Sequence, residues 1–256
     1  DPLSLDDYRA HGGVVGLEKA RVMTPTAIVE EIVASGLRGR GGAGFPAGIK
    51  WRTVLEAQGP QKFIVCNADE GDSGTFADRM LMEGDPFLLI EGMAIAGLAT
   101  GATRGVIYIR SEYPHAIATM REAIAIARRA DILNARFDIE IRVGAGAYVC
   151  GEETSLLESI EGKRGQVRAK PPLPAHKGLF GCPTVINNVL TLAAAPTILA
   201  EGGKAYAEHG MGRSRGTLPF QIAGNVKHGG LFEAPFGLTL RTMIEEIGGG
   251  TASGRP

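Results

Sequence analysis

Hydrophobic and polar positions follow two spacings along this chain, one typical of strands and the other typical of helices. Buried or alternating strands are predicted over residues 61–66, 105–109 and 137–143. Helices are predicted around them, over residues 24–36, 85–99, 113–129 and 151–160. This alternation of strands and helices predicts an α/β fold with a Rossmann-like, mostly parallel sheet and right-handed crossovers.

The second half of the chain is less regular. Residues 162–181 are rich in Pro, Gly and Lys and are predicted to form a long loop, and the apolar residues 184–199 are predicted to form one helix that bends or ends near Pro196. Two short strands and a helix are then predicted over residues 218–223, 230–233 and 238–247.

The composition changes near Arg213, which predicts a first α/β domain over residues 1–212 and part of a small second domain over residues 213–256. A tail of about 40 residues is too small to fold alone. The chain has no element that closes this tail and no initiator methionine, so we expect it to belong to a longer protein.

Composition and charge exclude several classes of protein. With 27 Lys and Arg against 28 Asp and Glu, the net charge of −1 offers no general attraction to nucleic acid. The hydrophobic content of 44% is too high for a disordered chain. No apolar run is long enough for direct membrane insertion and no signal peptide is visible, so a cytoplasmic location is expected.

Three cysteines, Cys66, Cys150 and Cys182, are scattered along the chain. Their odd number and their spacing argue against a disulfide framework and favour a reducing compartment. They also lack the spacing of iron–sulfur ligands, and the five histidines form no metal-binding or catalytic arrangement.

A glycine-rich loop precedes the first predicted strand, from Gly39 to Gly48. Its Gly39-Arg-Gly41-Gly-Ala-Gly44 matches a dinucleotide-binding pattern, but a helix and not a strand comes before it, so an ordinary Rossmann fingerprint is rejected. Glycines still permit close backbone approach to a phosphate, and Arg38, Arg40 and Lys50 add positive charge. We therefore predict that this loop binds a ligand and is more than a structural turn between two helices.

Polar residues follow the predicted strands, at the edge where an open α/β sheet binds its ligands. After the first strand come Asn67, Asp69, Glu70 and Asp72, which suit a hard cation, a nucleotide or a solvated turn. After the third strand, Cys150-Gly-Glu-Glu153 begins a helix, where carboxylates serve as caps or hold a cofactor. Asn187 and Asn188 near another helix start offer a phosphate site or an ordinary cap.

Four long motifs together resemble one family, the FMN- and NADH-binding flavoprotein subunits of complex I, of NAD-reducing hydrogenases and of soluble NAD-dependent formate dehydrogenase. These motifs are SGLRGRGGAGFPAGIKW (35–51), CNADEGDSGTFADR (66–79), GAGAYVCGEETSLLESIEGKRG (144–165) and KPPLPAHKGLFGCPTVINN (170–188). Residues 111–120 and 210–221 are most similar to the formate dehydrogenase beta subunit. The tail resembles the opening of a ubiquitin-like (β-grasp) domain.

The resemblance implies one pocket that holds FMN and admits NAD(H) above it. FMN or dinucleotide phosphates would contact the glycine loop and its lysine, that is Gly39, Arg40, Gly41, Gly42, Gly44 and Lys50. The flavin would contact Asn67, Asp69, Gly151 and Glu152, and its ribityl phosphate Asn187, Asn188 and Thr191. Glu70, Lys170 and Val185 complete the implied cofactor-binding set.

The same resemblance assigns the dinucleotide side. Glu153 would hydrogen-bond the nicotinamide and is the residue closest to a catalytic role, Phe45 would stack against NADH, and Asp72 would lie near the dinucleotide. Relatives carry two further aromatic residues where this chain has Thr53 and Leu173, so tight stacking of the adenine is not expected.

The chemistry implied is hydride transfer between NAD(H) and FMN, with electrons passed singly to iron–sulfur clusters of partner subunits. The [4Fe–4S] ligands of the family lie beyond the segment given by this sequence, so the chain alone is expected to act as a diaphorase. Two alternatives remain. One is a flavin-free interaction fragment of such a complex, and the other is a metal-dependent phosphate enzyme that uses Asp69, Glu70 and Asp72.

Overall fold

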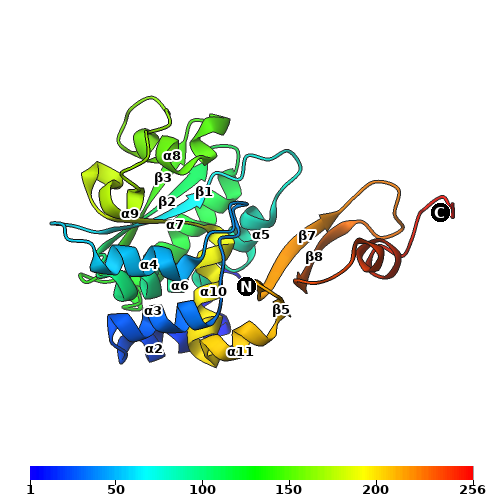
Figure 1. The fold of residues 1–256 in the computed structure, drawn as a ribbon, viewed down its shortest axis with the longest axis horizontal. Coiled ribbons are helices and arrows are strands. Elements are labelled where there is room, and N and C mark those ends of the chain that lie inside the picture. The colour runs from blue at the N-terminus through cyan, green and yellow to red at the C-terminus, as the bar shows by residue number, and fades with distance from the viewer. Residues whose placement is uncertain (256) are drawn as a thin grey trace.

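A parallel sheet lies at the centre of the computed structural model, which describes residues 1–255 (Figure 1). The strand order is β3-β2-β1-β4, formed by β1 (Phe63–Ala68), β2 (Arg104–Arg110), β3 (Asp138–Gly144) and β4 (Thr184–Asn188). All neighbouring strands are parallel. The predicted α/β class is confirmed, and the three predicted strands lie within two residues of their expected bounds.

Helices cover both faces of this sheet (Figure 1). Eleven α-helices are found in residues 1–255, namely α1 (Leu5–Ala10), α2 (Val15–Arg21), α3 (Pro25–Ala34), α4 (Ala47–Glu56), α5 (Ala77–Gly84), α6 (Pro86–Thr100), α7 (Pro114–Arg129), α8 (Glu153–Ile160), α9 (Pro174–Lys177), α10 (Val189–Glu201) and α11 (Gly203–Glu208). Two 3₁₀ turns add η1 (Tyr148–Gly151) and η2 (Leu179–Gly181).

The alternation of side chains along β1 divides the core between these two layers. Ile64 and Cys66 face the larger apolar cluster, which contains the buried sides of α3, α6, α7 and α10. Phe63 and Val65 face the smaller cluster, beside Leu156 of α8. Because β1 is buried on both faces, it reads in the sequence as a continuous apolar run.

The predicted helix over residues 184–199 is wrong at its start. Thr184–Asn188 forms strand β4, which pairs with β1, and the helix α10 begins only at Val189. An apolar strand that is buried between neighbours lacks the two-residue alternation, so its pattern merges with that of the helix that follows. Asn187 and Asn188 therefore lie at the carboxyl end of a central strand.

Pro196 lies inside α10 and does not end it. Proline supplies no N–H to the carbonyl four residues earlier, which is that of Leu192. This carbonyl lies so close to Gly92 of α6 that a Cβ on Gly92 would overlap its oxygen. The close approach of α6 and α10 therefore lets the freed carbonyl contact the glycine backbone. Helix α6 is buried on nearly all sides, and within residues 1–255 no helix is both long and apolar enough to cross a bilayer.

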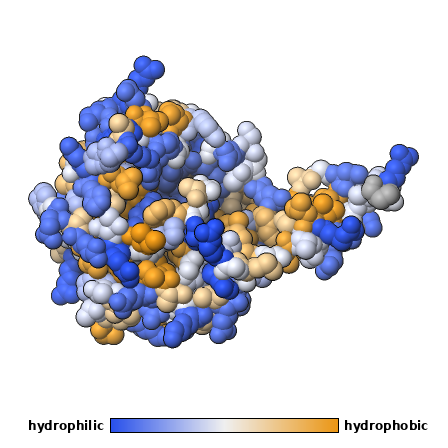
Figure 2. Space-filling model, in the orientation of Figure 1, coloured by the Kyte–Doolittle hydropathy of each residue, from blue (hydrophilic) through white to orange (hydrophobic). Residues whose placement is uncertain are grey.

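Residues beyond α11 form an arm that projects from the α/β body (Figure 1). The short strands β5 (Gly210–Met211) and β6 (Ser214–Arg215) lead into the antiparallel hairpin of β7 (Thr217–Ile222) and β8 (Gly230–Pro235). The two predicted strands are confirmed here, and the predicted final helix includes the π-helical η3 (Thr242–Ile247). Apolar side chains reach the surface of the arm (Figure 2), among them Leu238, Leu240 and Ile244.

Candidate functional site

A cavity of about 500 Å³ opens at the carboxyl ends of β1 and β4. Six segments that are distant in the sequence form its wall: the glycine loop, α4, the end of β1, the start of α8, the loop before α9 with the first residues of α9, and β4. The lining residues are Gly39, Gly41, Ala43, Gly44, Phe45, Lys50, Thr53, Asn67, Gly151, Glu152, Glu153, Lys170, Leu173, Pro174, Ala175, Thr184, Ile186, Asn187 and Asn188.

The glycine loop presents backbone to this cavity at Gly39, Gly41 and Gly44, and side chains at Ala43 and Phe45. Gly42 and Gly44 adopt left-handed conformations with φ of 100° and 61°, which glycine adopts without strain. The loop is closed by hydrogen bonds from the Gly39 N–H to the Phe45 carbonyl (2.9 Å) and from Arg38 Nε to the Gly44 carbonyl (2.6 Å). At Gly41 the loop comes so close to β4 that a Cβ would lie 3.2 Å from Cβ of Asn188.

Arg40 turns its side chain away from the cavity and toward the C-terminal arm. Its Nη2 donates to the Tyr206 hydroxyl (3.1 Å) and to the Arg215 carbonyl (2.6 Å), and its guanidinium lies 4.7 Å from the centre of the Phe236 ring. Its backbone N–H donates to Oγ1 of Thr191 in the first turn of α10 (2.8 Å). Arg40 therefore fastens the glycine loop to α10 and to the arm.

Two asparagines at the strand ends have their amide groups oriented by neighbours. Asn67 donates from Nδ2 to the Gly151 carbonyl (2.8 Å), and its Oδ1 accepts from the Asp69 N–H (3.1 Å). Asn187 accepts from the indole Nε1 of the fully buried Trp51 (2.8 Å). Because this bond occupies Oδ1, the Asn187 amide presents its N–H₂ group as the donor that remains for a ligand.

Two lysines and two glutamates form a charged cluster at one wall. Lys170 Nζ lies 3.0 Å from Glu152 and 2.8 Å from Glu153, and Lys50 Nζ lies 3.5 Å from Glu153 and donates to the Ile186 carbonyl (2.8 Å). Burial lowers the pKa of Lys50, and the neighbouring Glu153 carboxylate opposes this effect. The positive charges of the lysines are paired with the negative charges of the glutamates in this cluster. A ligand in the cavity therefore meets hydrogen-bond donors and acceptors but no large net charge.

Glu152 serves as the N-cap of α8 as well. Its Oε2 accepts from the backbone N–H groups of Thr154 (2.8 Å) and Ser155 (3.0 Å). Burial alone would raise the pKa of Glu152, but the hydrogen bonds from Thr154, Ser155 and Lys170 outweigh it and lower the pKa to about 2. Glu152 is therefore ionised at neutral pH.

The acidic side chains that follow β1 do not come together in a single site. Glu70 turns inward and caps α5 by accepting from the backbone N–H groups of Asp78 (3.0 Å) and Arg79 (3.2 Å). Asp72 is exposed and accepts from the Tyr148 hydroxyl (2.8 Å). In the part of the chain that the structure describes, no group of three or more His, Cys, Asp and Glu is arranged to hold a metal ion.

Asp69 has a different environment from its acidic neighbours. Its Oδ2 is buried and has no hydrogen-bond partner among residues 1–255. Burial raises the pKa of Asp69, an effect that the Arg110 guanidinium opposes. A buried acceptor without a donor is costly, so this oxygen indicates a place where a ligand donor completes the site.

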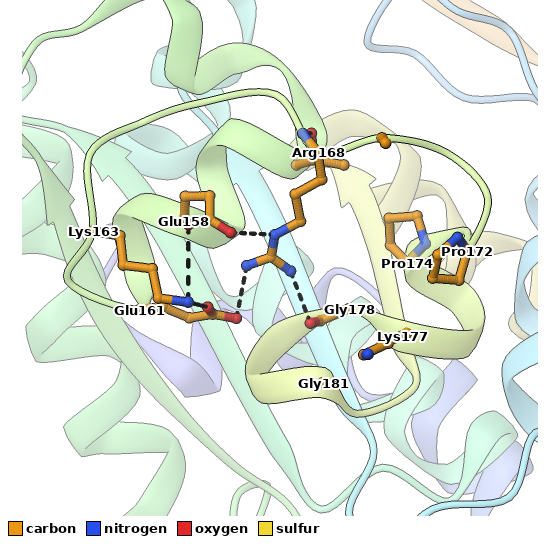
Figure 3. A pocket seen from close by; sticks show the side chains of 11 residues that line it. Glu158, Glu161, Lys163, Arg168, Pro172, Pro174, Lys177, Gly178 and Gly181 are labelled. Atoms are coloured by element: carbon orange, nitrogen blue, oxygen red, sulfur yellow. Dashed lines mark hydrogen bonds and ion pairs between the residues drawn. The ribbon is translucent and has the colours of Figure 1, made fainter.

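The loop that carries Lys170 is held beside a second, smaller cavity of about 360 Å³ (Figure 3). Arg168 points between two carboxylates of α8 and its C-terminal end, where it pairs with Glu158 and lies 2.8 Å from Glu161. It also donates to the Gly178 carbonyl (3.0 Å). These bonds fix the loop between α8 and α9 and so place Lys170 against the glutamates of the main cavity.

Comparison with known proteins identifies the class of this site. The family model described as the Nuo51 FMN-binding domain matches residues 32–197. The chain belongs to the Nuo51 FMN-binding domain family. The matched segment includes the glycine loop, the ends of β1 and β4 and the start of α8, so it contains every residue that lines the main cavity.

Similar proteins and solved structures support the membership of the chain in this family. The chain is 50% identical to the NADP-reducing hydrogenase subunit HndC of Solidesulfovibrio fructosivorans, over 100% of this chain and 53% of the relative. It is 49% identical to a subunit of the NADH-quinone oxidoreductase of Aquifex aeolicus, over 97% and 60%. The crystal structure of an NAD⁺-reducing [NiFe]-hydrogenase in the H₂-reduced state matches with a TM-score of 0.84 at 41% identity, over 91% of this chain and 40% of that one. The chain thus spans about half to three fifths of the length of these curated relatives.

The residues present fit FMN, the cofactor of the Nuo51 FMN-binding domain family and the cofactor that the sequence implied. The cavity volume of about 500 Å³ lies in the ordinary range for small-molecule sites. Its glycine wall admits a flat ring close to the backbone, and the unpartnered Oδ2 of Asp69 lies directly behind the lining residue Gly151, where a Cβ would be 3.7 Å from it. Lys50 and the N-terminal end of α10 suit a phosphate.

The structure brings together most, but not all, of the residues predicted for this site. Twelve of them line the cavity: Gly39, Gly41, Gly44, Phe45, Lys50, Asn67, Gly151, Glu152, Glu153, Lys170, Asn187 and Asn188. Those outside the lining are Arg40, Gly42, Asp69, Glu70, Asp72, Val185 and Thr191. Val185 and Thr191 are fully buried behind the wall, and the role assigned to each of these residues stays a prediction.

Sequence reasoning missed the lining residues Thr184 and Ile186 because it placed them in a helix. It also missed Trp51, which orients Asn187, and the buried Asp78, which contacts Asn188. Recognising Thr184–Asn188 as a strand would have found the first two, because ligands gather at strand ends. The contacts of Trp51 and Asp78 leave no local signal in the sequence.

The pKa of Asp78 predicts how stability depends on pH. Burial, with a smaller contribution from Glu70, raises this pKa from 3.8 to about 8, while the hydrogen bond from Asn188 opposes the shift. Between these two values the folded chain binds a proton that the unfolded chain releases. The free energy of unfolding is therefore expected to fall as the pH rises through this window, by up to about 1.4 kcal/mol per pH unit.

Urea unfolding at pH 5, 6.5 and 8 measures this dependence. The variant Asp78→Asn cannot ionise, so its stability is expected to rise relative to the original chain as the pH increases from 5 to 8. If the free energy of unfolding changed with pH in the same way in both proteins, the raised pKa of Asp78 would be contradicted.

Proposed function

We propose that this chain forms the FMN- and NAD(H)-binding part of an NADH:acceptor oxidoreductase subunit. The observation that carries the proposal is the cavity of about 500 Å³ at the ends of β1 and β4, with its glycine wall, its oriented amides and its paired lysines and glutamates. FMN held by these residues would supply the chemistry that couples two-electron hydride transfer from a nicotinamide to one-electron transfer.

The protein's own contribution is position and electrostatics, because no side chain has to donate or accept a proton. The backbone of Gly39, Gly41 and Gly44 lets a cofactor approach closely, and the Asn187 amide offers donors from the end of β4. Lys50 lies within the wall with its ammonium group held by the Ile186 carbonyl, which suits it to bind an anionic group.

The mouth of the cavity is the proposed entry of NAD(H). Phe45 and Leu173 both line the cavity and are about half exposed, so they offer apolar surface there for a nicotinamide or adenine ring. Glu153, held between Lys50 and Lys170, is the carboxylate proposed to accept a hydrogen bond from the carboxamide side of the nicotinamide. The two lysines on either side of it fix the orientation of this carboxylate.

The whole protein is proposed to work in a complex whose other subunits carry iron–sulfur clusters, with the arm as part of a small β-grasp domain that follows residue 212. The electron donor of that complex stays a prediction. The preference for a formate dehydrogenase beta subunit within the family rests on residues 111–120 and 210–221, whereas the hydrogenase and quinone oxidoreductase relatives match nearly all of the chain. Hydrogenase or complex I membership is therefore the alternative.

The visible spectrum of the purified chain tests the proposal. We expect about one FMN per chain, released on denaturation and identified as FMN, and bleaching of its absorbance when NADH is added. A colourless protein that also fails to take up added FMN would contradict the proposal and favour a flavin-free interaction fragment. Bound FMN that NADH does not bleach would separate the flavin site from the dinucleotide site.

A further inference from the structure

A buried carboxylate lies directly behind the wall of the cavity. Asp78 occupies the first turn of α5, is only 4% exposed and does not line the cavity. Its Oδ2 accepts a hydrogen bond of 2.6 Å from Nδ2 of Asn188, which does line it. The hydride-transfer chemistry makes no use of this contact.

Asn188 joins three parts of the site. It is the last residue of β4 and the N-cap of α10, where its Oδ1 accepts from the Leu190 N–H (2.9 Å). The glycine loop packs on it at Gly41, where a Cβ would lie 3.2 Å from its own. With Oδ1 bound to Leu190 and one N–H bound to Asp78, the amide is held in a single orientation and keeps one N–H for a ligand.

Asp78 is itself held from the other side. The Glu70 carboxylate accepts from the backbone N–H groups of Asp78 and Arg79, and it also accepts from the Tyr113 hydroxyl (3.0 Å). The start of α5 is therefore fixed to the segment after β1. One chain of hydrogen bonds runs from the end of β1 through α5 to the junction of β4 and α10.

We propose that Asp78 is a positioning residue for the cofactor cavity, which acts through Asn188 to hold the β4–α10 junction and the glycine loop in the geometry that binds FMN. The proposal deepens the function given above and rests on it. Asp78 touches no cofactor atom, and its part is to accept one hydrogen bond from a buried position.

The protonation state of Asp78 is compatible with this positioning role. Its raised pKa, about 8, means that the carboxyl is largely protonated near neutral pH, and the oxygen that faces Asn188 accepts a hydrogen bond in that form too. Glu70 and the buried thiol of Cys66 are the titratable groups that interact with it. An asparagine has the same shape and offers the same acceptor, whereas an alanine offers none.

Titration of the cofactor-free chain with FMN, followed by flavin fluorescence, tests the proposal. We expect Asp78→Ala to raise the Kd for FMN by about 10-fold or more, which corresponds to roughly one well-placed hydrogen bond. Asp78→Asn should restore the Kd to within about threefold of the original chain. In an Asn188→Ala background, Asp78→Ala should have little further effect, because its action passes through Asn188.

A matched control separates positioning from general destabilisation. Glu91 is another buried carboxylate, 2% exposed, which accepts hydrogen bonds from the start of α2 and does not line the cavity. Glu91→Gln should lower the Tm without changing the Kd for FMN. If Asp78→Ala does not fold, Asp78→Ser replaces it, because its hydroxyl is too short to reach Asn188.

Hydrogen exchange of the cofactor-free chain gives a second readout that needs no FMN. We expect faster exchange over residues 39–45 and 188–191 in Asp78→Ala, and unchanged exchange there in Asp78→Asn and Glu91→Gln. The proposal is overturned if Asp78→Ala leaves both the Kd and this exchange unchanged, or if Asp78→Asn behaves like Asp78→Ala, or if Glu91→Gln weakens FMN equally. If the original chain binds no FMN, the proposed function fails, and the exchange experiment still decides whether Asp78 positions these segments.

Discussion

Replacing Gly41 by valine is expected to weaken FMN binding by about 100-fold. The glycine loop packs so tightly on β4 that even a Cβ at this position lies 3.2 Å from Cβ of Asn188, and a branched side chain has to push the two apart. The loop then loses its close approach to the cofactor. If the proposed binding of the loop to the cofactor uses two backbone N–H groups, the loss of both at about 1.5 kcal/mol each amounts to about 3 kcal/mol, which is roughly 100-fold in Kd.

Fluorescence titration of the cofactor-free variants with FMN measures this effect. Gly41→Ala should give a smaller loss, because a displacement of a few tenths of an ångström accommodates its Cβ. Gly84→Val is the control, since Gly84 is exposed at the end of α5 and a Cβ there meets no atom within 4 Å. Equal affinity of Gly41→Val and Gly84→Val for FMN would show that the glycine loop is a structural turn and not part of the cofactor site.

Replacing Glu91 by alanine is expected to lower the free energy of unfolding by about 3–5 kcal/mol, the largest loss of stability that we predict. The buried Glu91 carboxylate accepts from the Tyr8 hydroxyl (2.6 Å) and from the backbone N–H groups of Val14 (2.7 Å) and Leu17 (2.9 Å). Without it, three donors around the start of α2 have no partner in the core. Burial and the Glu91 charge both raise the pKa of Tyr8, so its phenol stays a donor at any ordinary pH.

Urea unfolding at pH 7 measures this loss against a surface control. Glu245→Ala removes an exposed carboxylate whose partner is Arg241, four residues away, and a pair of this kind contributes less than about 1 kcal/mol. Comparable losses for Glu91→Ala and Glu245→Ala would contradict the structural role of Glu91. FMN affinity should be unaffected in both variants once each is folded, because neither residue lines the cavity or hydrogen-bonds to a residue that does.

Glu91 and Asp78 make two different kinds of buried polar contact in this fold. Glu91 satisfies donors that belong to the fold alone, on the helical side of the core. Asp78 satisfies a donor that belongs to the cofactor cavity. Both carboxylates are nearly inaccessible, so burial alone does not distinguish them, and only the identity of the bonded partner does.

The sequence by itself determined the α/β class, three of the four central strands and the segments that meet at the site. It did so because each of these features has a local cause: alternation in β3, glycines where φ is positive, and carboxylates at a helix start. The family resemblance in the four long motifs added the cofactor, which the family match of residues 32–197 confirms.

Only the tertiary structure decided the rest. Thr184–Asn188 became a strand because it pairs with β1, and no local pattern separates a doubly buried strand from a helix. The contacts of the Arg40 side chain with Tyr206 and Arg215 could not be predicted from the sequence, because these partners lie more than 160 residues away in the chain. Asp78 and Asn188 are 110 residues apart in the sequence, and only folding brings them close enough to form a hydrogen bond.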